Sequence, residues 1–151
     1  YERDTAGAGR WRGAPGVRTR IRFLAENITN AMLAGVRHPT RGFCGAGDGP
    51  PNQLALIEDG GRTDVTEVVY NRRLPANSAI EFLRGGGGGW GSALDRPVAE
   101  VAADIANDYV SPDHAAAAYG IVADASGGAV DREATLQRRA ALARGQSGRH
   151  L

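Results

Sequence analysis

The sequence predicts an α+β fold, with an antiparallel β-rich N-terminal half followed by a helical C-terminal tail. Three observations support this class. Residues 16–24 alternate between apolar and arginine side chains, with the period of two that is typical of a half-buried strand. Beyond Pro97, apolar side chains recur at helical spacing. Five consecutive glycines, residues 85–89, separate the two patterns.

The N-terminal half is predicted to contain several short strands joined by turns. In the first, Val17, Thr19, Ile21 and Phe23 face one way, while Arg18, Arg20 and Arg22 face the other and form a solvated cationic face. Further strands are expected at 28–33, 54–57, 65–70 and 79–83, with turns at 59–61 and 74–78. Residues 1–15 and 35–53 are predicted to be loops. The second loop is long, and long ordered loops are usually functional or packed on a partner.

Three helices are predicted in the tail. The first has one apolar face and Pro97 in its first turn, with Asp95 or Arg96 near the cap. Its apolar residues are Val98, Val101, Ala102, Ile105 and Tyr109. The second begins at the cap Ser111 and ends at Gly120, followed by an extended pair at 121–122. Asp131 caps the third, which carries Leu136 and Leu142, and residues 145–151 are expected to fray.

The composition excludes several classes of protein. The chain has 151 residues, enough for one domain with a core. With 18 basic and 17 acidic residues, the net charge of +1 gives no reason to expect nucleic acid or a membrane surface as a partner. The single cysteine excludes an internal disulfide and is compatible with the cytoplasm. No apolar run approaches the roughly 20 residues of a transmembrane helix.

The glycine run has two interpretations. Glycine runs serve as flexible linkers, but ordering them costs backbone entropy, so an ordered run implies backbone packed close to something else. A strand just before the run, Trp90 just after it and a helix start soon beyond favour an ordered loop. We therefore expect a β-rich segment at 1–91 that ends in this glycine-rich loop, and a helical tail at 92–151.

Neither glycine-rich stretch has the chemistry of a nucleotide loop. Residues 7–13 lack the preceding strand and following helix of a dinucleotide site, and 85–89 lack a following Lys-Ser/Thr. ATP is therefore not expected to bind in this segment. The single Arg10-Trp11-Arg12-Gly13 stretch is weak evidence for RNA binding. Either Trp11 packs and the arginines pair with carboxylates, or Arg10 or Arg12 anchors an anionic substrate or a partner chain.

The histidines and the cysteine do not form a recognisable site. His38 and Cys44 are two ligands at most, which is too few for zinc. A nucleophilic role for Cys44 would need a nearby base, and His38 is the only local candidate, so we interpret Cys44 as structural or incidental. His114 is expected to be solvated, and no metal ligand is assigned.

Three stretches resemble the C-terminal region of the hydantoinase B / 5-oxoprolinase family, which includes N-methylhydantoinase B and acetone carboxylase-like proteins. They are residues 7–17, residues 86–91, and residues 109–112 followed by 119–122. They are similar to the family's glycine-rich Arg-aromatic-Arg entry, its Gly-Gly-Gly-Gly-Tyr-Gly box and its Tyr-Val-Ser-Pro…Tyr-Gly-Val-Val tail. The chain departs from the family pattern at five positions: Ala8, Ala14, Arg84, Asp108 and the direct Arg96-Pro97 junction.

The resemblance implies that this chain is the C-terminal fragment of a larger subunit. That subunit would belong to an ATP-dependent hydrolase that opens cyclic amides such as hydantoins or 5-oxoproline. The alternative is a non-catalytic module that joins subunits in such a complex or in a related ATP-dependent carboxylase. The implied partners are a hydantoinase A-type subunit, which binds ATP and phosphorylates the substrate's carbonyl oxygen, and a small cyclic amide. ATP and a divalent metal are implied for the full hetero-oligomer, with no cofactor in this segment.

Six residues are candidates for substrate or loop contacts: Arg10, Arg12, Gly86, Gly87, Gly88 and Gly89. We assign no catalytic residue to this chain, and the fragment alone is expected to be inactive.

Overall fold

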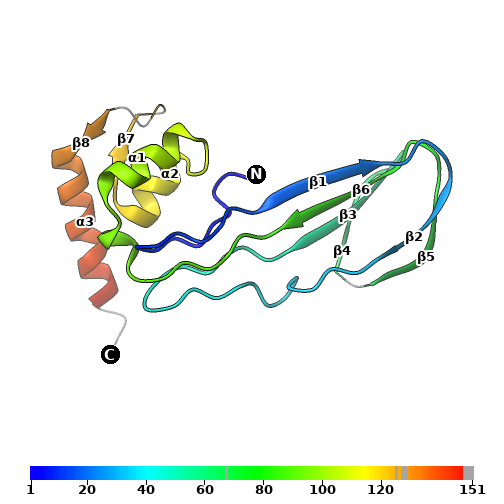
Figure 1. The fold of residues 1–151 in the computed structure, drawn as a ribbon, viewed down its shortest axis with the longest axis horizontal. Helices are drawn as coiled ribbons and strands as arrows, with labels where there is room; N and C mark the ends of the chain where they lie inside the picture. The colour runs from blue at the N-terminus through cyan, green and yellow to red at the C-terminus, as the bar shows by residue number, and fades with distance from the viewer. Residues whose placement is uncertain (67, 125, 127–128, 148–151) are drawn as a thin grey trace.

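The computed structural model describes residues 1–66, 68–124, 126 and 129–147. The antiparallel strands of the first half precede every helix, and the longest described helix comes last, which confirms the predicted α+β class (Figure 1). The strands are β1 (Val17–Arg22), β2 (Asn27–Ala31), β3 (Gln53–Glu58), β4 (Gly61–Val65), β5 (Val69–Leu74), β6 (Ala79–Arg84), β7 (Val122–Ala123) and β8 (Val130–Asp131). The helices are the 3-10 helix η1 (Ala93–Asp95), α1 (Val98–Ala106), α2 (Pro112–His114), the π-helical turn η2 (Ala115–Tyr119) and α3 (Arg132–Ser147).

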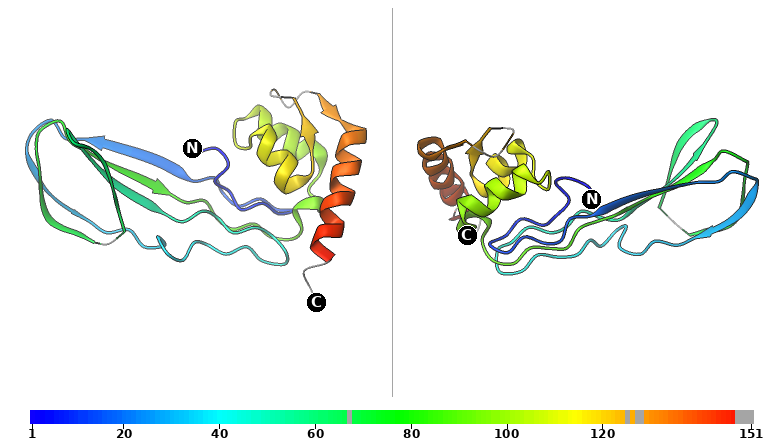
Figure 2. Two further views of the ribbon diagram at one scale, coloured as in Figure 1. Left: turned by 180° about the vertical axis from the view of Figure 1, so that it is seen from behind. Right: turned by 45° about the horizontal axis from the view of Figure 1, so that its top comes forward.

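An antiparallel four-stranded sheet in the order β1-β6-β3-β4 extends as an arm away from the helices (Figure 2). The central strands β6 and β3 alternate residues between two faces. One face carries apolar side chains, and the two-stranded ribbon β2–β5 packs against it. The core of this arm consists of Leu54, Leu56, Val69, Leu74 and Ile80. Burial of these side chains is the main stabilising contribution in this half of the chain.

The other face of the sheet is charged. The three arginines of β1 are exposed on it, as predicted, but carboxylates lie among them, so the face is not purely cationic. Glu81 in β6 is only 9% exposed and accepts hydrogen bonds from Arg62 and from Arg18, whose Nη1 lies 2.8 Å away. Arg18 also donates to both carboxylate oxygens of Glu2. These contacts, that of Arg62 first, lower the pKa of Glu81. Carboxylates therefore pair with Arg18, whereas Arg22 donates to Asn77 Oδ1 and Arg20 remains exposed.

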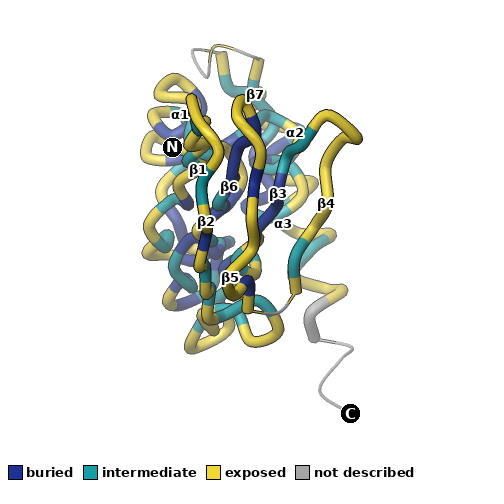
Figure 3. Tube along the Cα trace, turned by 90° about the vertical axis from the view of Figure 1, so that its right-hand side faces the viewer, coloured by how far each residue is buried: buried dark blue, intermediate teal, exposed yellow. Residues whose placement is uncertain are grey.

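The prediction that β1 is half-buried is wrong for the described chain. Val17 and Ile21 on its apolar side are 38% and 46% exposed. In Figure 3, exposed segments of the edge strands flank the buried central strands β6 and β3. These side chains are exposed because β1 is an edge strand, whereas the core is built around the middle of the sheet.

The predicted strand at 65–70 is also wrong. β4 ends at Val65 and pairs with β3, whereas β5 begins at Val69 and pairs with β2. The chain therefore leaves one sheet and enters the other within the predicted strand, and residue 67 lies outside the described residues. A run of β-forming residues does not reveal such a change of partner, because the two pairings need the same residue types.

The helices pack around a second core cluster, which confirms the helical tail. Its buried members are Ala93, Val101, Ile105, Val110, Ala115, Tyr119 and Ile121. Two predicted caps are confirmed: Ser111 Oγ accepts from His114 N at 3.1 Å, and Asp131 Oδ1 accepts from Ala134 N at 2.9 Å. Gly120 ends η2 with a left-handed φ of +64°, as expected for a helix-terminating glycine.

The helix boundaries differ from the prediction. Pro97 is the N-cap of α1, one position earlier than its expected place in the first turn. α1 ends at Ala106, because Asp108 adopts a left-handed φ of 59°, and Tyr109 lies beyond the helix. α3 continues to Ser147 where fraying from 145 was expected, and residues 148–151 lie outside the described residues. None of the described helices is both long and apolar enough to cross a membrane.

Candidate functional site

Three extended segments, residues 5–16, 40–50 and 85–91, lie side by side between the sheet and the helices, and we call them the glycine layer (Figure 1). Backbone hydrogen bonds connect them. Gly7 N donates to Gly87 O at 2.9 Å, and Gly87 N donates to Ala14 O at 2.9 Å. Gly89 N donates to Gly47 O at 3.0 Å. The glycine run is therefore ordered within the described chain, as its flanking residues indicated.

Close backbone packing explains why the layer needs glycine. A Cβ atom on Gly86 would lie within 3.0 Å of Thr5 O, and one on Gly88 would lie within 3.0 Å of Arg41 O. Real Cβ atoms essentially never approach another atom this closely. No residue of the run has a positive φ, so steric contact and not a left-handed backbone imposes glycine here. Gly87 is less confined, because its nearest neighbour, Ala14 N, would lie 3.3 Å away.

Arg12 ties the glycine layer to α1. Its Nε and Nη2 donate to the two carboxylate oxygens of Asp104 at 3.0 and 2.9 Å. Its Nη1 donates to Gly13 O at 2.9 Å, and the guanidinium lies 5.1 Å from the centre of the Tyr109 ring. Every nitrogen of this side chain therefore has a partner inside the protein.

Asp104 holds a second arginine. Arg96 Nη2 donates to Asp104 Oδ2 at 3.0 Å, and Arg96 Nη1 donates to Arg10 O at 3.1 Å. Asp104 and Arg96 are 6% and 8% exposed, so this is a buried charge cluster. Charges are buried in proteins only when they are paired and hydrogen-bonded. The sequence did not predict this pairing, although Asp104 lies beside Ile105 and three residues after Val101, on the buried stripe of α1.

Arg10 also contacts the protein. Its Nη1 donates to Asp95 O at 3.1 Å, and its guanidinium carbon lies 5.9 Å from the centre of the Trp11 ring. The structure thus brings all six candidate residues into the glycine layer and gives both arginines protein partners. Of the two interpretations left open for these arginines, pairing with a carboxylate holds for Arg12. Substrate contacts by Arg10 or by residues 86–89 stay a prediction.

Three exposed aromatic side chains lie along one edge of the layer. Trp11 and Trp90 exchange backbone hydrogen bonds of 3.0 and 2.9 Å, while Phe43 bonds to Gly89 and Gly91 on either side of Trp90. Residues paired in this way project to the same side. The side chains of this aromatic row, Trp11, Phe43 and Trp90, are 58%, 67% and 52% exposed. Trp11 therefore does not pack into the core of the described chain.

The remaining titratable candidates do not converge. Cys44 is exposed and has a left-handed φ of 54°, so of the two interpretations, structural or incidental, its exposure favours the incidental one. His114 is half-buried against Tyr119, with ring centres 6.2 Å apart, where a solvated side chain was expected. Among the described residues, no group of three or more His, Cys, Asp or Glu side chains could hold a metal ion.

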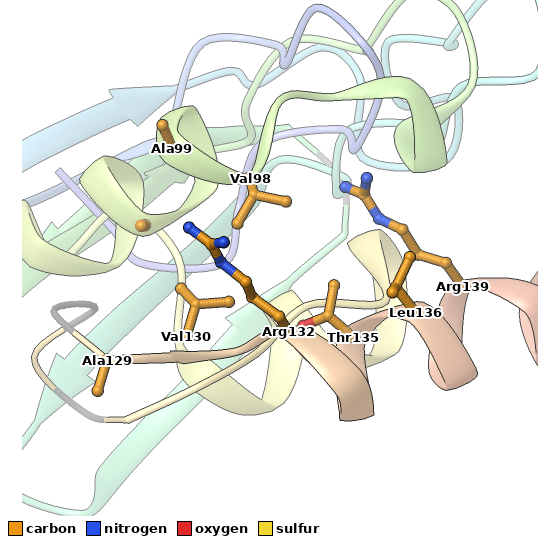
Figure 4. Close-up of a pocket in the computed structure, with 9 residues that line it drawn as sticks. Val98, Ala99, Ala129, Val130, Arg132, Thr135, Leu136 and Arg139 are labelled. Carbon is orange, nitrogen blue, oxygen red and sulfur yellow. The ribbon is translucent and has the colours of Figure 1, made fainter.

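A groove of about 730 Å³ lies between α1 and α3 (Figure 4). Val98, Ala102, Val130 and Leu136 provide much of its apolar lining. Arg139 on its border donates to Tyr119 O at 3.1 Å and to Arg96 O at 2.7 Å, and burial lowers the pKa of this guanidinium. The described residues of the lining include no carboxylate, imidazole or thiol, so they offer no general base.

A family profile and a curated relative point to the same protein family. The sequence profile described as Hydantoinase B/oxoprolinase matches residues 1–93. Caprolactamase subunit beta of Pseudomonas jessenii is 35% identical over 143 residues, which cover 91% of this chain and 24% of that protein. The chain therefore spans about a quarter of the length of this curated relative.

Two solved structures share the fold. The crystal structure of ATP-dependent caprolactamase from Pseudomonas jessenii superposes with a TM-score of 0.80 at 34% identity, over 91% of this chain and 24% of that chain. The nucleotide-free structure of acetone carboxylase superposes with a TM-score of 0.67 at 16% identity, over 99% of this chain and 25% of that chain. At that identity, the second match supports the fold alone.

Proposed function

Because the chain belongs to the hydantoinase B/oxoprolinase family, we propose that it is the C-terminal part of the B-type subunit of an ATP-dependent cyclic-amide hydrolase. The observation that carries this proposal is the 35% identity to caprolactamase subunit beta over 91% of the chain. That similarity extends beyond the family profile, which ends at residue 93, into the helices.

Within that subunit, we propose that this chain shapes and supports the active site. The glycine layer is joined by backbone hydrogen bonds, and a buried carboxylate clamps it to α1 through Arg12 and Arg96. Such interlocked contacts hold a segment in one geometry, which is what a site needs to position a substrate. Substrate contacts, where this chain makes them, are proposed at Arg10 and the backbone of residues 86–89.

The catalytic partner in this proposal is an A-type subunit. It binds ATP and phosphorylates the carbonyl oxygen of the cyclic amide, and the B-type subunit processes the activated intermediate in a hetero-oligomer. ATP and a divalent metal are bound outside this chain. A cytoplasmic location fits the ATP requirement and the free thiol of Cys44.

The test is an activity assay of the full-length subunit together with its A-type partner. Phosphate release is measured with caprolactam, 5-oxoproline, a hydantoin and acetone, and ring-opened products are quantified by mass spectrometry. We expect ATP hydrolysis that depends on a cyclic amide and matches ring opening mole for mole. Phosphate release that depends on a ketone and bicarbonate, without ring opening, would instead identify a carboxylase.

The aromatic row supports a second candidate function, a module that mainly joins subunits. Exposed apolar patches rimmed by polar residues commonly mark protein interfaces. In this alternative, Phe43→Ser would dissociate the hetero-oligomer in size-exclusion chromatography while each subunit keeps its melting temperature. An intact complex with wild-type turnover would exclude an assembly role for this row.

A further inference from the structure

The outer edge of β1 is unpaired. β1 forms a ladder only with β6 among the described residues. Phe23 N donates to Ser78 O at the end of this ladder, while Gly16 O accepts from Glu2 N on the opposite side of the strand. Because successive residues of an antiparallel strand point their N–H and C=O groups to alternate sides, the odd-numbered residues bond to β6. The backbone groups of Arg18, Arg20 and Arg22 therefore point away from the sheet.

No described residue forms a backbone hydrogen bond with these three arginines on that side. Residues 17–22 contain no proline and pair with β6 without a bulge, so apart from the charges of its three arginines the strand has no feature that blocks pairing at this edge. Such an edge is a template for one more strand.

The N-terminal residues already start that strand. Glu2 lies antiparallel to Gly16, with a hydrogen bond of 2.9 Å from Glu2 N to Gly16 O. The Glu2 side chain lies on the charged face of the sheet, where it binds Arg18. In Figure 1 the N-terminus lies beside the beginning of β1.

We propose that the segment immediately preceding Tyr1 in the full-length subunit forms a fifth strand of this sheet, antiparallel to β1. This inference rests on the proposed function, in which the chain is one part of a longer subunit. The register follows from the pairing of Glu2 with Gly16. The residue just before Tyr1 lies opposite Arg18, the third residue before it lies opposite Arg20, and the fifth lies opposite Arg22.

The register also defines the chemistry of the added strand. Its residues opposite Arg18, Arg20 and Arg22 lie on the charged face. Among the described residues, Arg18 pairs with carboxylates and Arg22 with Asn77, but Arg20 has no ion-pair partner. An acidic side chain is therefore expected opposite Arg20. Its residues opposite Thr19 and Ile21 lie on the apolar face. Apolar side chains there would cover Ile21, which is 46% exposed and borders a groove of about 570 Å³ between the sheet and β2.

Residue-resolved hydrogen exchange of the full-length subunit tests the proposal. Thr19 and Ile21 amides bond to β6 and should be protected in either case, so they serve as internal controls. We expect the Arg18, Arg20 and Arg22 amides to be protected as well, exchanging at least roughly a hundred-fold more slowly than free amides. Exchange of these three amides at the free rate, with Thr19 and Ile21 protected, would overturn the proposal.

A variant identifies the strand that protects the edge. Replacing the five residues before Tyr1 with a Gly-Ser sequence should restore fast exchange at Arg18, Arg20 and Arg22 and leave Thr19 and Ile21 unchanged. If the three amides stay protected, or become protected only when the A-type subunit or a second copy is added, the strand comes from elsewhere and the proposal is wrong.

The ring-opening assay on the same wild-type preparation separates this proposal from the proposed function. An active enzyme with a freely exchanging β1 edge would overturn the added strand alone. A protected edge in a subunit that opens no cyclic amide with its partner would overturn the function and support the strand.

Discussion

Arg12 in the glycine layer and Asp104 in α1 lie 92 residues apart in the sequence and form a two-pronged ion pair, with N–O distances of 3.0 and 2.9 Å. Asp104 also binds Arg96, which pairs in addition with the more exposed Glu100, so two guanidinium groups share one buried carboxylate. This cluster makes the packing of the helices depend on the glycine layer.

Asp104→Asn should destabilise the chain strongly. The change keeps the shape of the side chain but removes the carboxylate that pairs with Arg12 in a buried place. Arg96 loses the same partner and keeps only the half-exposed Glu100, 3.2 Å from its Nη1. Breaking one partner of a buried pair costs about 3 kcal/mol of unfolding free energy, measurable by urea denaturation. Asp108→Asn is the matched control, because it breaks an exposed ion pair with Arg3. The Arg3 and Asp108 side chains are 54% and 79% exposed, so the loss should cost less than about 1 kcal/mol of unfolding free energy. Equal losses in the two variants would contradict a special role for the cluster.

Gly88→Ala and Gly87→Ala should differ although the residues are adjacent. The new methyl group at Gly88 would collide with the backbone of Arg41, whereas the one at Gly87 has its nearest neighbour at 3.3 Å. Overpacking of this kind costs roughly 1–3 kcal/mol. We therefore expect a clear fall in melting temperature for Gly88→Ala and a small one for Gly87→Ala. A flexible linker would tolerate both substitutions equally well.

Glu81 should make the fold sensitive to acid. Its hydrogen bonds with Arg62 and Arg18 lower its pKa in the folded state below the ordinary value of 4.5. The carboxylate therefore stabilises the fold fully above about pH 4.5, and this contribution is lost as the pH falls through the lower, folded-state pKa. Between about pH 6 and about pH 3, the melting temperature of the wild type should fall further than that of Glu81→Gln. We expect the two falls to differ by roughly 3 °C.

A parallel fall in the Glu81→Gln variant would show that other groups dominate the acid response. Glu26→Gln serves as the control, because Glu26 and its partner Arg73 are 60% and 71% exposed, and such surface pairs contribute little. Its melting temperature should follow that of the wild type throughout.

The 151-residue chain is expected not to bind ATP on its own. A phosphate loop needs free backbone amides, but Gly85, Gly87 and Gly89 donate theirs to Asn52, Ala14 and Gly47. Calorimetric titration of ATP should give no heat above dilution. Micromolar binding would contradict this prediction, and loss of that binding in Gly88→Ala would then locate the site in the glycine layer.

Local sequence signals predicted the elements whose causes are local. Ser111 and Asp131 cap helices because their side chains reach the next turn, and Gly120 ends η2 because glycine tolerates a left-handed φ. The strand at 79–83 was predicted because its residues favour strands and a turn precedes them. These features involve residues only a few positions apart, so a short window of sequence contains them.

The faces of β1 and the break between β4 and β5 could not be predicted in this way. Whether Ile21 is covered depends on the position of β1 in the sheet, and whether Arg18 is paired with a carboxylate depends on Glu81 in β6. Both are decided by pairing between distant strands. Alternation in the sequence indicates which residues share a face, but it does not indicate what lies against that face.

Residue spacing and short motifs encode the α+β class, the caps Ser111 and Asp131 and the family resemblance, so these could be predicted before folding was considered. Three other features could be recognised only in the folded chain: the glycines at 85–89 pack against two other segments, Arg12 and Arg96 share Asp104, and the aromatic row is exposed. Close backbone contact and charge pairing depend on distances between segments. Those distances exist only once the chain has folded.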